Sequence, residues 1–188
     1  MRPFAAAFAS ASVPSGFGTP EAYVLLPLQV QPQGAEFWCW LATSVSVDNF
    51  YGGSSTQCRL ADELLNQSTC CAFPGSIDCD QPGFAECALQ RLGRHYLTHR
   101  LDGGCFGHGD IQHELQAGRP PVLQFRFNGG NDHVVVPIGA GRDARSEEFV
   151  RIGDPAVGWK QVDVSWRLAH LYRGGVSWKH VFRTSAVP

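Results

Sequence analysis

The chain has 188 residues, of which 44% are hydrophobic and 17% are charged, so one ordinary domain with a full core is expected and global disorder is excluded. The formal net charge is −2 and the basic residues form no run or stripe, which argues against nucleic acid as a partner. No apolar run approaches the ~18–20 residues that a membrane helix requires, so no membrane partner is expected either.

The N-terminal segment differs in composition from the rest of the chain. Residues 1–22 are rich in Ala, Ser, Pro and Gly and contain a single basic residue, which predicts a flexible leader and makes a poor secretion signal. Residues 23–188 are expected to form a single domain. It opens with a short apolar strand at 23–28, followed by a loop that contains Pro32 and Gly34.

Helical patterns occupy the next part of the chain. Small and apolar residues recur on one side from residue 38 or 39 to about 51, which predicts a helix that Gly52 ends. Thr56 is the expected N-cap of a second helix, residues 84–92 form a third, and Asp110 is expected to cap a fourth that runs through Gln116. Residues 70–82 have no period and hold three cysteines, which predicts a loop stapled by disulfides.

Beyond Pro120 the pattern changes to strands. Residues 122–127 alternate, residues 133–138 form a buried apolar run, and further strands are expected at 147–152, 160–164 and 176–182, with one or two helical turns at 166–172. Helices followed by an antiparallel sheet indicate an α+β fold. We expect a helical lobe at about 23–118, a sheet lobe at about 119–188, and a cleft between them.

The cysteine pattern is the most informative feature of the composition. The chain has seven cysteines: Cys39, Cys58, Cys70, Cys71, Cys79, Cys87 and Cys105. One cysteine apart from an even set is typical of a reactive thiol beside a disulfide framework. Such a framework indicates an oxidising destination outside the cell that made the protein. We expect three disulfides among the last six cysteines, with Cys70 and Cys71 bonded to different partners.

A zinc site is the alternative for these cysteines, with His108 and His113 as further ligands. The spacing does not fit paired C-x-x-C knuckles, and the adjacent Cys70 and Cys71 would have to point apart. We therefore expect no metal.

Cys39 lies where a helix is expected to begin. Free N–H groups and the helix dipole favour negative charge there, and so favour a thiolate. Gln33 precedes it in a loop, where its side-chain amide can join the Cys39 backbone N–H in binding an oxyanion. Trp38 and Trp40 can shield the sulfur and contact substrate. The alternative is a buried structural cysteine with both tryptophans in the core.

Two later residues can complete a catalytic set. His133 opens the buried valine run, which fixes its backbone at the rim of a sheet, as a general base requires. Asp154 ends another strand and can hold the second imidazole nitrogen. Asp132 is a candidate substrate-binding residue, but neighbouring side chains of a strand point to opposite faces, so Asp154 is preferred as the partner of His133.

At these residues the chain resembles papain-like cysteine peptidases. Gln33, five residues and then Cys39 within Phe-Trp-Cys-Trp-Leu-Ala resemble their active-site signature, and the order Gln, Cys, His, Asp is that of papain. The Trp-Cys-Trp form resembles that of a bacterial branch, which includes avirulence-type effector proteases and bacteriocin-leader peptidases. The same branch has His and Asp elements similar to residues 133–139 and 150–155. Papain itself has Asn as its third catalytic residue, and many bacterial members lack the cysteine-rich segment, so substrate specificity is not carried over.

The resemblance implies a papain-like two-lobe fold and a cysteine peptidase that cleaves a protein or peptide substrate through Cys39, His133 and Asp154. Gln33 would stabilise the oxyanion, and no cofactor would be needed. We expect a monomer that is secreted or delivered as an effector. Two alternatives remain open: transglutaminase or deamidase chemistry with the same residues, and a catalytically silent, disulfide-rich binding module.

Overall fold

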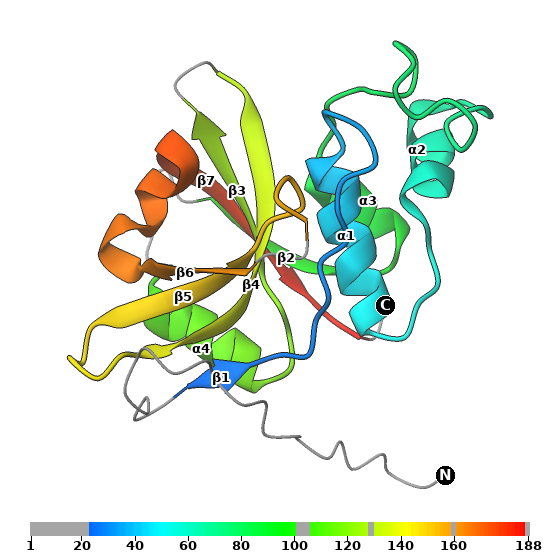
Figure 1. The fold of residues 1–188 in the computed structure, drawn as a ribbon. Helices are drawn as coiled ribbons and strands as arrows, with labels where there is room; N and C mark the ends of the chain where they lie inside the picture. The colour runs from blue at the N-terminus through cyan, green and yellow to red at the C-terminus, as the bar shows by residue number, and fades with distance from the viewer. Residues whose placement is uncertain (1–22, 101–105, 128–129, 159–160, 187–188) are drawn as a thin grey trace, which may run out of the picture.

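An antiparallel sheet lies beside a group of three helices (Figure 1). The computed structural model describes residues 23–100, 106–127, 130–158 and 161–186, so the leader predicted at 1–22 lies outside the described residues. Helices and an antiparallel sheet together confirm the α+β class expected from the order of the sequence patterns.

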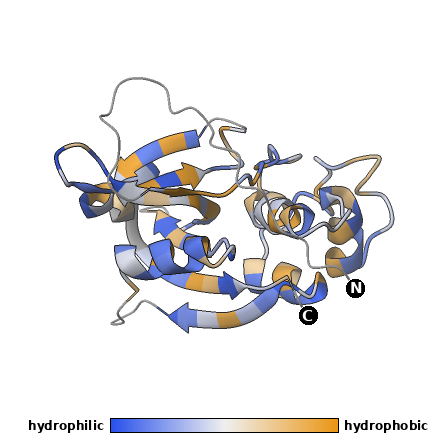
Figure 2. Ribbon diagram, turned by 90° about the horizontal axis from the view of Figure 1, so that it is seen from below, coloured by the Kyte–Doolittle hydropathy of each residue, from blue (hydrophilic) through white to orange (hydrophobic). Residues whose placement is uncertain are grey.

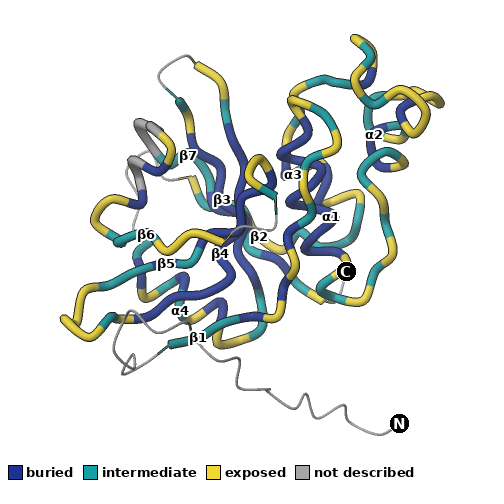
Figure 3. The backbone as a smooth tube through the Cα atoms, viewed as in Figure 1, coloured by how far each residue is buried: buried dark blue, intermediate teal, exposed yellow. Residues whose placement is uncertain are grey.

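The central helix is α1 (Cys39–Phe50), which packs against α2 (Gln57–Leu65) and α3 (Ala85–Arg91) and against the sheet. Because it has neighbours on several sides, α1 is buried along most of its length, as Figure 3 shows. Its core-facing hydroxyls are satisfied locally or across the interface. The Thr43 hydroxyl donates to the carbonyl oxygen of Val134 at 3.1 Å, which joins α1 directly to the sheet.

Two helix caps were predicted from the sequence. Thr56 is the N-cap of α2, although its side chain makes no capping hydrogen bond. The N-cap of α4 (His108–Gln116) is Gly107, and Asp110 is the third residue of the helix, so the prediction that Asp110 caps it was wrong. The Asp110 carboxylate reaches back to accept the Gly107 N–H at 2.7 Å, which places an acidic side chain in the first turn without making it the cap.

The sheet has seven strands in the order β2-β7-β3-β4-β5-β6, with β1 paired to β4, and every pairing is antiparallel. The strands are β1 (Val24–Leu25), β2 (His95–Arg100), β3 (Val122–Phe127), β4 (Asp132–Arg142), β5 (Glu148–Gly153), β6 (Gln161–Ser165) and β7 (Gly175–Thr184). The 3-10 helix η1 (Trp166–Gly174) connects β6 to β7.

Three elements before residue 118 are associated with the sheet. β1 pairs with β4, β2 pairs with β7, and α4 packs against β4 and β5. Hydrophobic residues recur along the strands and along the helices beside them (Figure 2). A single buried cluster therefore runs from α1, where Leu41 and Val45 are fully buried, into β4, where Val135 is fully buried.

Two disulfides staple the segment that follows α2. They join Cys58 to Cys71 and Cys70 to Cys79, which confirms that the adjacent cysteines have different partners. Three disulfides were expected, but Cys87 is a free, exposed thiol on α3, and Cys105 lies outside the described residues. The sulfurs of Cys70 and Cys79 are bonded to each other, so they are not available to zinc.

None of the helices in the described segments is long and apolar enough to cross a membrane.

Candidate active site

Cys39 opens α1 at the edge of a cleft of about 640 Å³ between the helices and the sheet. Gln33 and Trp40 line this cleft from the helical side, and His133 and Arg173 line it from the sheet side. The Cys39 residue is 8% exposed. Its backbone N–H belongs to the first turn of the helix, where such groups have no acceptor within the helix, so it can serve an anion in the cleft.

His133 lies near the start of β4 and is held by aromatic rings of the neighbouring strand. Phe125, its register partner on β3, meets the imidazole edge-on at 5.5 Å between centroids. Phe127 stacks on the imidazole at 5.9 Å. The strand fixes the backbone and the two rings restrict the side chain, so the imidazole has a defined orientation.

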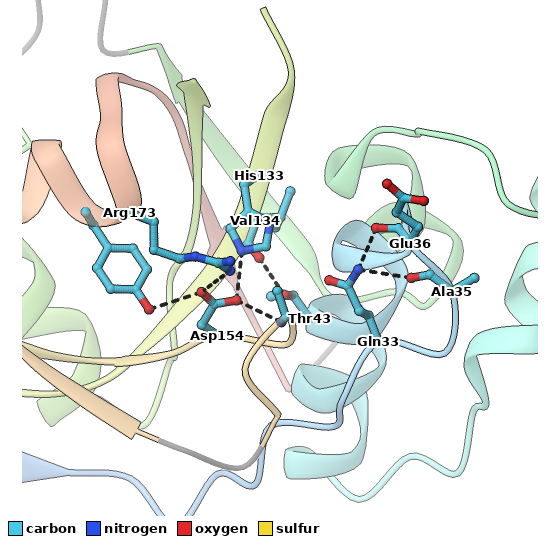
Figure 4. A network of polar contacts seen from close by, with 10 residues as sticks. Gln33, Ala35, Glu36, Thr43, His133, Val134, Asp154 and Arg173 are labelled. Atoms are coloured by element: carbon cyan, nitrogen blue, oxygen red, sulfur yellow. Dashed lines mark hydrogen bonds and ion pairs between the residues drawn. The ribbon is translucent and has the colours of Figure 1, made fainter. Parts of the chain in front are cut away.

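The imidazole of His133 has two side-chain partners. Its Nε2 lies 2.8 Å from Oδ1 of Asp154, a contact drawn in Figure 4, and the Cys39 side chain is its other hydrogen-bond partner. Burial lowers the pKa of His133, but the hydrogen bonds to Asp154 and Cys39 outweigh this effect and raise the pKa to about 9. The site can therefore hold an imidazolium beside the Cys39 sulfur at neutral pH.

Asp154 directly follows β5 and is fully buried. Its Oδ1 also accepts the Ala156 N–H at 2.8 Å, while Oδ2 accepts the Tyr172 hydroxyl and the Arg173 guanidinium, both at 3.0 Å (Figure 4). Burial raises the pKa of Asp154, but the hydrogen bond and charge of His133, with help from Ala156 and Arg173, lower the pKa to about 2. The carboxylate is thus ionised and fixed in position.

Sequence reasoning missed Tyr172 and Arg173. Both lie where η1 departs from helical geometry, and Arg173 has a φ of 52°, in the left-handed region. This kink allows two consecutive side chains to reach the same carboxylate oxygen. Burial and the neighbouring carboxylate raise the pKa of Tyr172, so its hydroxyl stays protonated and donates. The sequence contains no motif that would have pointed to either residue.

Gln33 lines the cleft, but its amide nitrogen already donates hydrogen bonds to two backbone carbonyl oxygens. Nε2 donates to the carbonyl oxygens of Ala35 at 3.0 Å and Glu36 at 2.5 Å (Figure 4). The Gln33 Oε1 is buried and has no hydrogen-bond partner among the described residues. An oxyanion role therefore requires the amide to release one of the two carbonyls.

The three expected substrate-binding residues differ in position. Trp40 and Asp132 line the cleft. Trp38 is only 1% exposed, does not line the cleft and donates its indole N–H to the carbonyl oxygen of Cys79, so the expected substrate contact is replaced by a packing role. Burial raises the pKa of Asp132. The hydrogen bonds that its carboxylate accepts from Lys179, Arg126 and Gln124 outweigh the effect of burial, so the pKa is lowered overall.

Comparisons with known proteins bear on the family and the fold. The model of the Peptidase C39-like family matches residues 25–180. The structure of the Amb a 11 cysteine protease of ragweed pollen, in its proform, superposes with a TM-score of 0.54 at 13% identity, covering 88% of this chain and 65% of the ragweed chain. The bromelain protease from Ananas comosus, in complex with the E64 inhibitor, gives a TM-score of 0.51 at 11% identity, covering 83% and 93% of the two chains.

A further structural match, the Pseudomonas avirulence protein AvrPphB, has a TM-score of 0.33 at 13% identity and covers 80% of this chain and 92% of that chain. No curated protein sequence matches this chain significantly. The two structures with higher TM-scores confirm the papain-like α+β fold.

Proposed function

This chain belongs to the Peptidase C39-like family and is a papain-like cysteine protease, and we propose that it cleaves peptide bonds through Cys39, His133 and Asp154. The observation that carries the proposal is that one imidazole is shared between the Cys39 side chain and a fully buried carboxylate. This is the arrangement that an activated nucleophile and its base require.

In the proposed reaction, the Cys39 thiolate attacks the carbonyl carbon of the substrate. The resulting oxyanion is bound by the Cys39 N–H and by the Gln33 amide, which exchanges one backbone carbonyl for the oxyanion. The His133 imidazolium then gives its proton to the leaving nitrogen, and the C–N bond breaks to leave a thioester.

Deacylation uses the same residues in the opposite direction. His133 takes a proton from water, the hydroxide attacks the thioester carbonyl, and the thiolate of Cys39 leaves. Asp154 stays ionised throughout and stabilises the imidazolium each time it forms. All of these groups come from one chain, so the proposed reaction requires no residue of a second subunit.

We propose a protein or peptide as the substrate and an oxidising compartment as the destination. The open cleft beside Cys39 supports an extended peptide as the ligand. The two disulfides support secretion or delivery as an effector, because such bonds persist outside a reducing cytosol.

The test compares the wild-type protein with Cys39→Ala and His133→Ala on a denatured protein mixture, with mass-spectrometric mapping of new N-termini. We expect new N-termini only with the wild type. The E64 inhibitor, seen on bromelain, should bond covalently to Cys39, and equally well when the second free thiol among the described residues is removed by Cys87→Ser. Equal cleavage by Cys39→Ala would overturn the proposal.

The same mixture separates peptide hydrolysis from acyl transfer. A primary amine is added, and peptides are searched for its incorporation at glutamine side chains. Incorporation that depends on Cys39 without new N-termini would favour the transglutaminase alternative over hydrolysis.

A further inference from the structure

The loop between α2 and α3 forms hydrogen bonds with the residues on both sides of Cys39. The two tryptophans that flank the nucleophile donate their indole N–H groups to this loop, Trp38 to the carbonyl oxygen of Cys79 at 2.7 Å and Trp40 to that of Gln81 at 3.2 Å. Both contacts join residues 41 positions apart in the sequence. The start of α1 is therefore positioned by a loop that supplies none of the proposed catalytic groups.

Asp80 lies between those two loop residues and binds the turn that leads into α1. Its Oδ1 accepts the backbone N–H of Phe37 at 2.8 Å, and its Oδ2 accepts that of Glu36 at 3.2 Å. A carboxylate that accepts two backbone N–H groups makes charge-assisted hydrogen bonds, which are stronger than those between neutral groups.

The same turn is bound from the cleft side by the proposed oxyanion donor. The carbonyl oxygen of Glu36, which accepts the Gln33 amide, and the N–H of Phe37, which binds Asp80, belong to one peptide group. Asp80 and Gln33 thus hold opposite ends of a single peptide plane. Hydrogen bonds in such a chain polarise one another, so the carboxylate makes that carbonyl a better acceptor for Gln33.

The loop that carries Asp80 has no helix or strand of its own and depends on a covalent closure. Its Cys79 is bonded to Cys70, and both residues are fully buried. The loop also approaches the start of α1 very closely, since a Cβ placed on Gly83 would lie 2.5 Å from the Trp40 ring. A displacement of the loop would therefore also displace the turn at residues 36–38 that leads into Cys39, the nucleophile turn.

We propose that Asp80, on the loop closed by the Cys70–Cys79 disulfide, is a positioning residue that fixes the Glu36–Phe37 peptide and through it the Gln33 amide; this inference rests on the proposed function. An oxyanion donor must lie about 2.7–3.1 Å from the charge that develops, and a displacement of about 1 Å can cost on the order of 10²-fold in rate. Asp80 therefore acts on the turnover rate and not on the reactivity of the thiol.

The variant Asp80→Asn keeps the size of the side chain but places an amide nitrogen against one of the two N–H groups. Asp78→Asn is the matched control, because Asp78 is an exposed carboxylate of the same loop and makes no hydrogen bond or ion pair with the described residues. We expect Asp80→Asn to lower kcat about 10-fold to 100-fold with little change in KM and in the alkylation rate of Cys39. Asp78→Asn should match the wild type.

A double-variant cycle with Gln33 tests the route of the effect. If Asp80 acts through the Gln33 amide, Asp80→Asn should add less than about twofold to the loss already caused by Gln33→Ala. Losses that multiply would overturn the proposal. The pair Cys70→Ser and Cys79→Ser, checked for folding by circular dichroism, should lower kcat in the same way as Asp80→Asn, and an unchanged kcat would count against the role of the closed loop.

One measurement does not depend on turnover. In the Cys39→Ala protein, Asp80→Asn should speed hydrogen exchange of the Phe37 backbone amide at least tenfold, because that N–H loses its acceptor or its fixed geometry. Unchanged exchange overturns the positioning role even if the enzyme is active. Faster exchange in a protein whose wild type cleaves nothing would support the positioning of the turn while rejecting the proposed peptidase.

Discussion

The Nε2 atom of His133 lies 2.8 Å from Oδ1 of Asp154, and the carboxylate is shielded completely from solvent. Both oxygens of that carboxylate also have further donors, the Ala156 N–H on one and the Tyr172 and Arg173 side chains on the other. A carboxylate that accepts this many hydrogen bonds remains an acceptor, so in the proposed reaction it would orient the imidazole without carrying a proton itself.

The first prediction concerns the reactivity of Cys39, for which Cys87 is an internal reference. The Cys87 thiol is free and exposed, whereas the Cys39 thiol is buried and forms a hydrogen bond with His133. We expect iodoacetamide to modify Cys39 first and to do so with little loss of rate down to about pH 5, because the imidazolium favours the thiolate. Peptide mapping after short exposure measures both rates. Faster modification of Cys87 at pH 5 contradicts the ion pair.

The second prediction concerns the alkaline limit of activity. The leaving nitrogen needs a proton from His133, whose pKa is raised to about 9, so kcat/KM should fall as the pH rises through about 9. Replacing the carboxylate by Asp154→Asn removes the negative charge that raises this pKa and weakens the hydrogen bond that the imidazole makes. The variant's residual activity should therefore begin to fall at lower pH, and an unshifted profile would count against the pairing.

The ion pair between His133 and Asp154 predicts how the stability of the fold varies with pH. The raised pKa of His133 contributes stability that is fully present below 6.5 and is lost as the pH rises through about 9. The lowered pKa of Asp154 contributes stability that is present above 3.8 and is lost as the pH falls toward about 2. The difference in Tm between the wild type and His133→Gln should therefore be largest between these limits, at about pH 4 to 6.5. Thermal unfolding at several pH values measures it.

Tyr172 provides a test of how the carboxylate is held. Tyr172→Phe removes one buried donor to Asp154, and the loss of a hydrogen bond to a charged group should lower the free energy of unfolding by about 1.5–3 kcal/mol. Tyr96→Phe is the control, because Tyr96 is 66% exposed on β2. Denaturant unfolding of both variants gives the comparison, and equal losses would argue against a specific contact.

Gln33→Ala tests the proposed oxyanion donor. Loss of one such donor should lower kcat by about 10²–10³-fold, or about 2.7–4 kcal/mol, with little effect on folding. Gln90→Ala, at an exposed position of α3, is the control and should retain full activity. A kcat for Gln33→Ala within about threefold of the wild type would remove Gln33 from the mechanism.

The central residues of the site could be predicted from sequence because each has a local signature. Cys39 lies at the start of a helix, His133 opens an apolar strand, and Asp154 follows another strand; the structure brings these three together. Their catalytic roles stay predictions. Each signature depends on secondary structure, which hydrophobic periodicity indicates well.

The surrounding contacts could not be predicted because they depend on tertiary structure. Tyr172 and Arg173 reach Asp154 through a kink in η1, and Asp80 reaches the nucleophile turn across 43 and 44 positions of sequence. Cysteine spacing likewise predicts disulfides without fixing their pairing. Cys87, which the cysteine count placed in a disulfide, is a free and exposed thiol of α3.

The pairing of the cysteines has a consequence for how the chain is oxidised after synthesis. The two disulfides close over separations of only 13 and 9 residues, both within the segment 58–79. Short loops lose slightly less entropy on closing than long ones, by about 0.6 kcal/mol per doubling of length, so bonds within the segment are modestly favoured in the unfolded chain over bonds to Cys39, which lies outside it. Oxidation can therefore proceed locally, and folding then places Cys39 at the edge of a cleft with 8% of its surface exposed. In this way one chain can acquire bonds that need an oxidant and still keep reduced the thiol on which the proposed reaction depends.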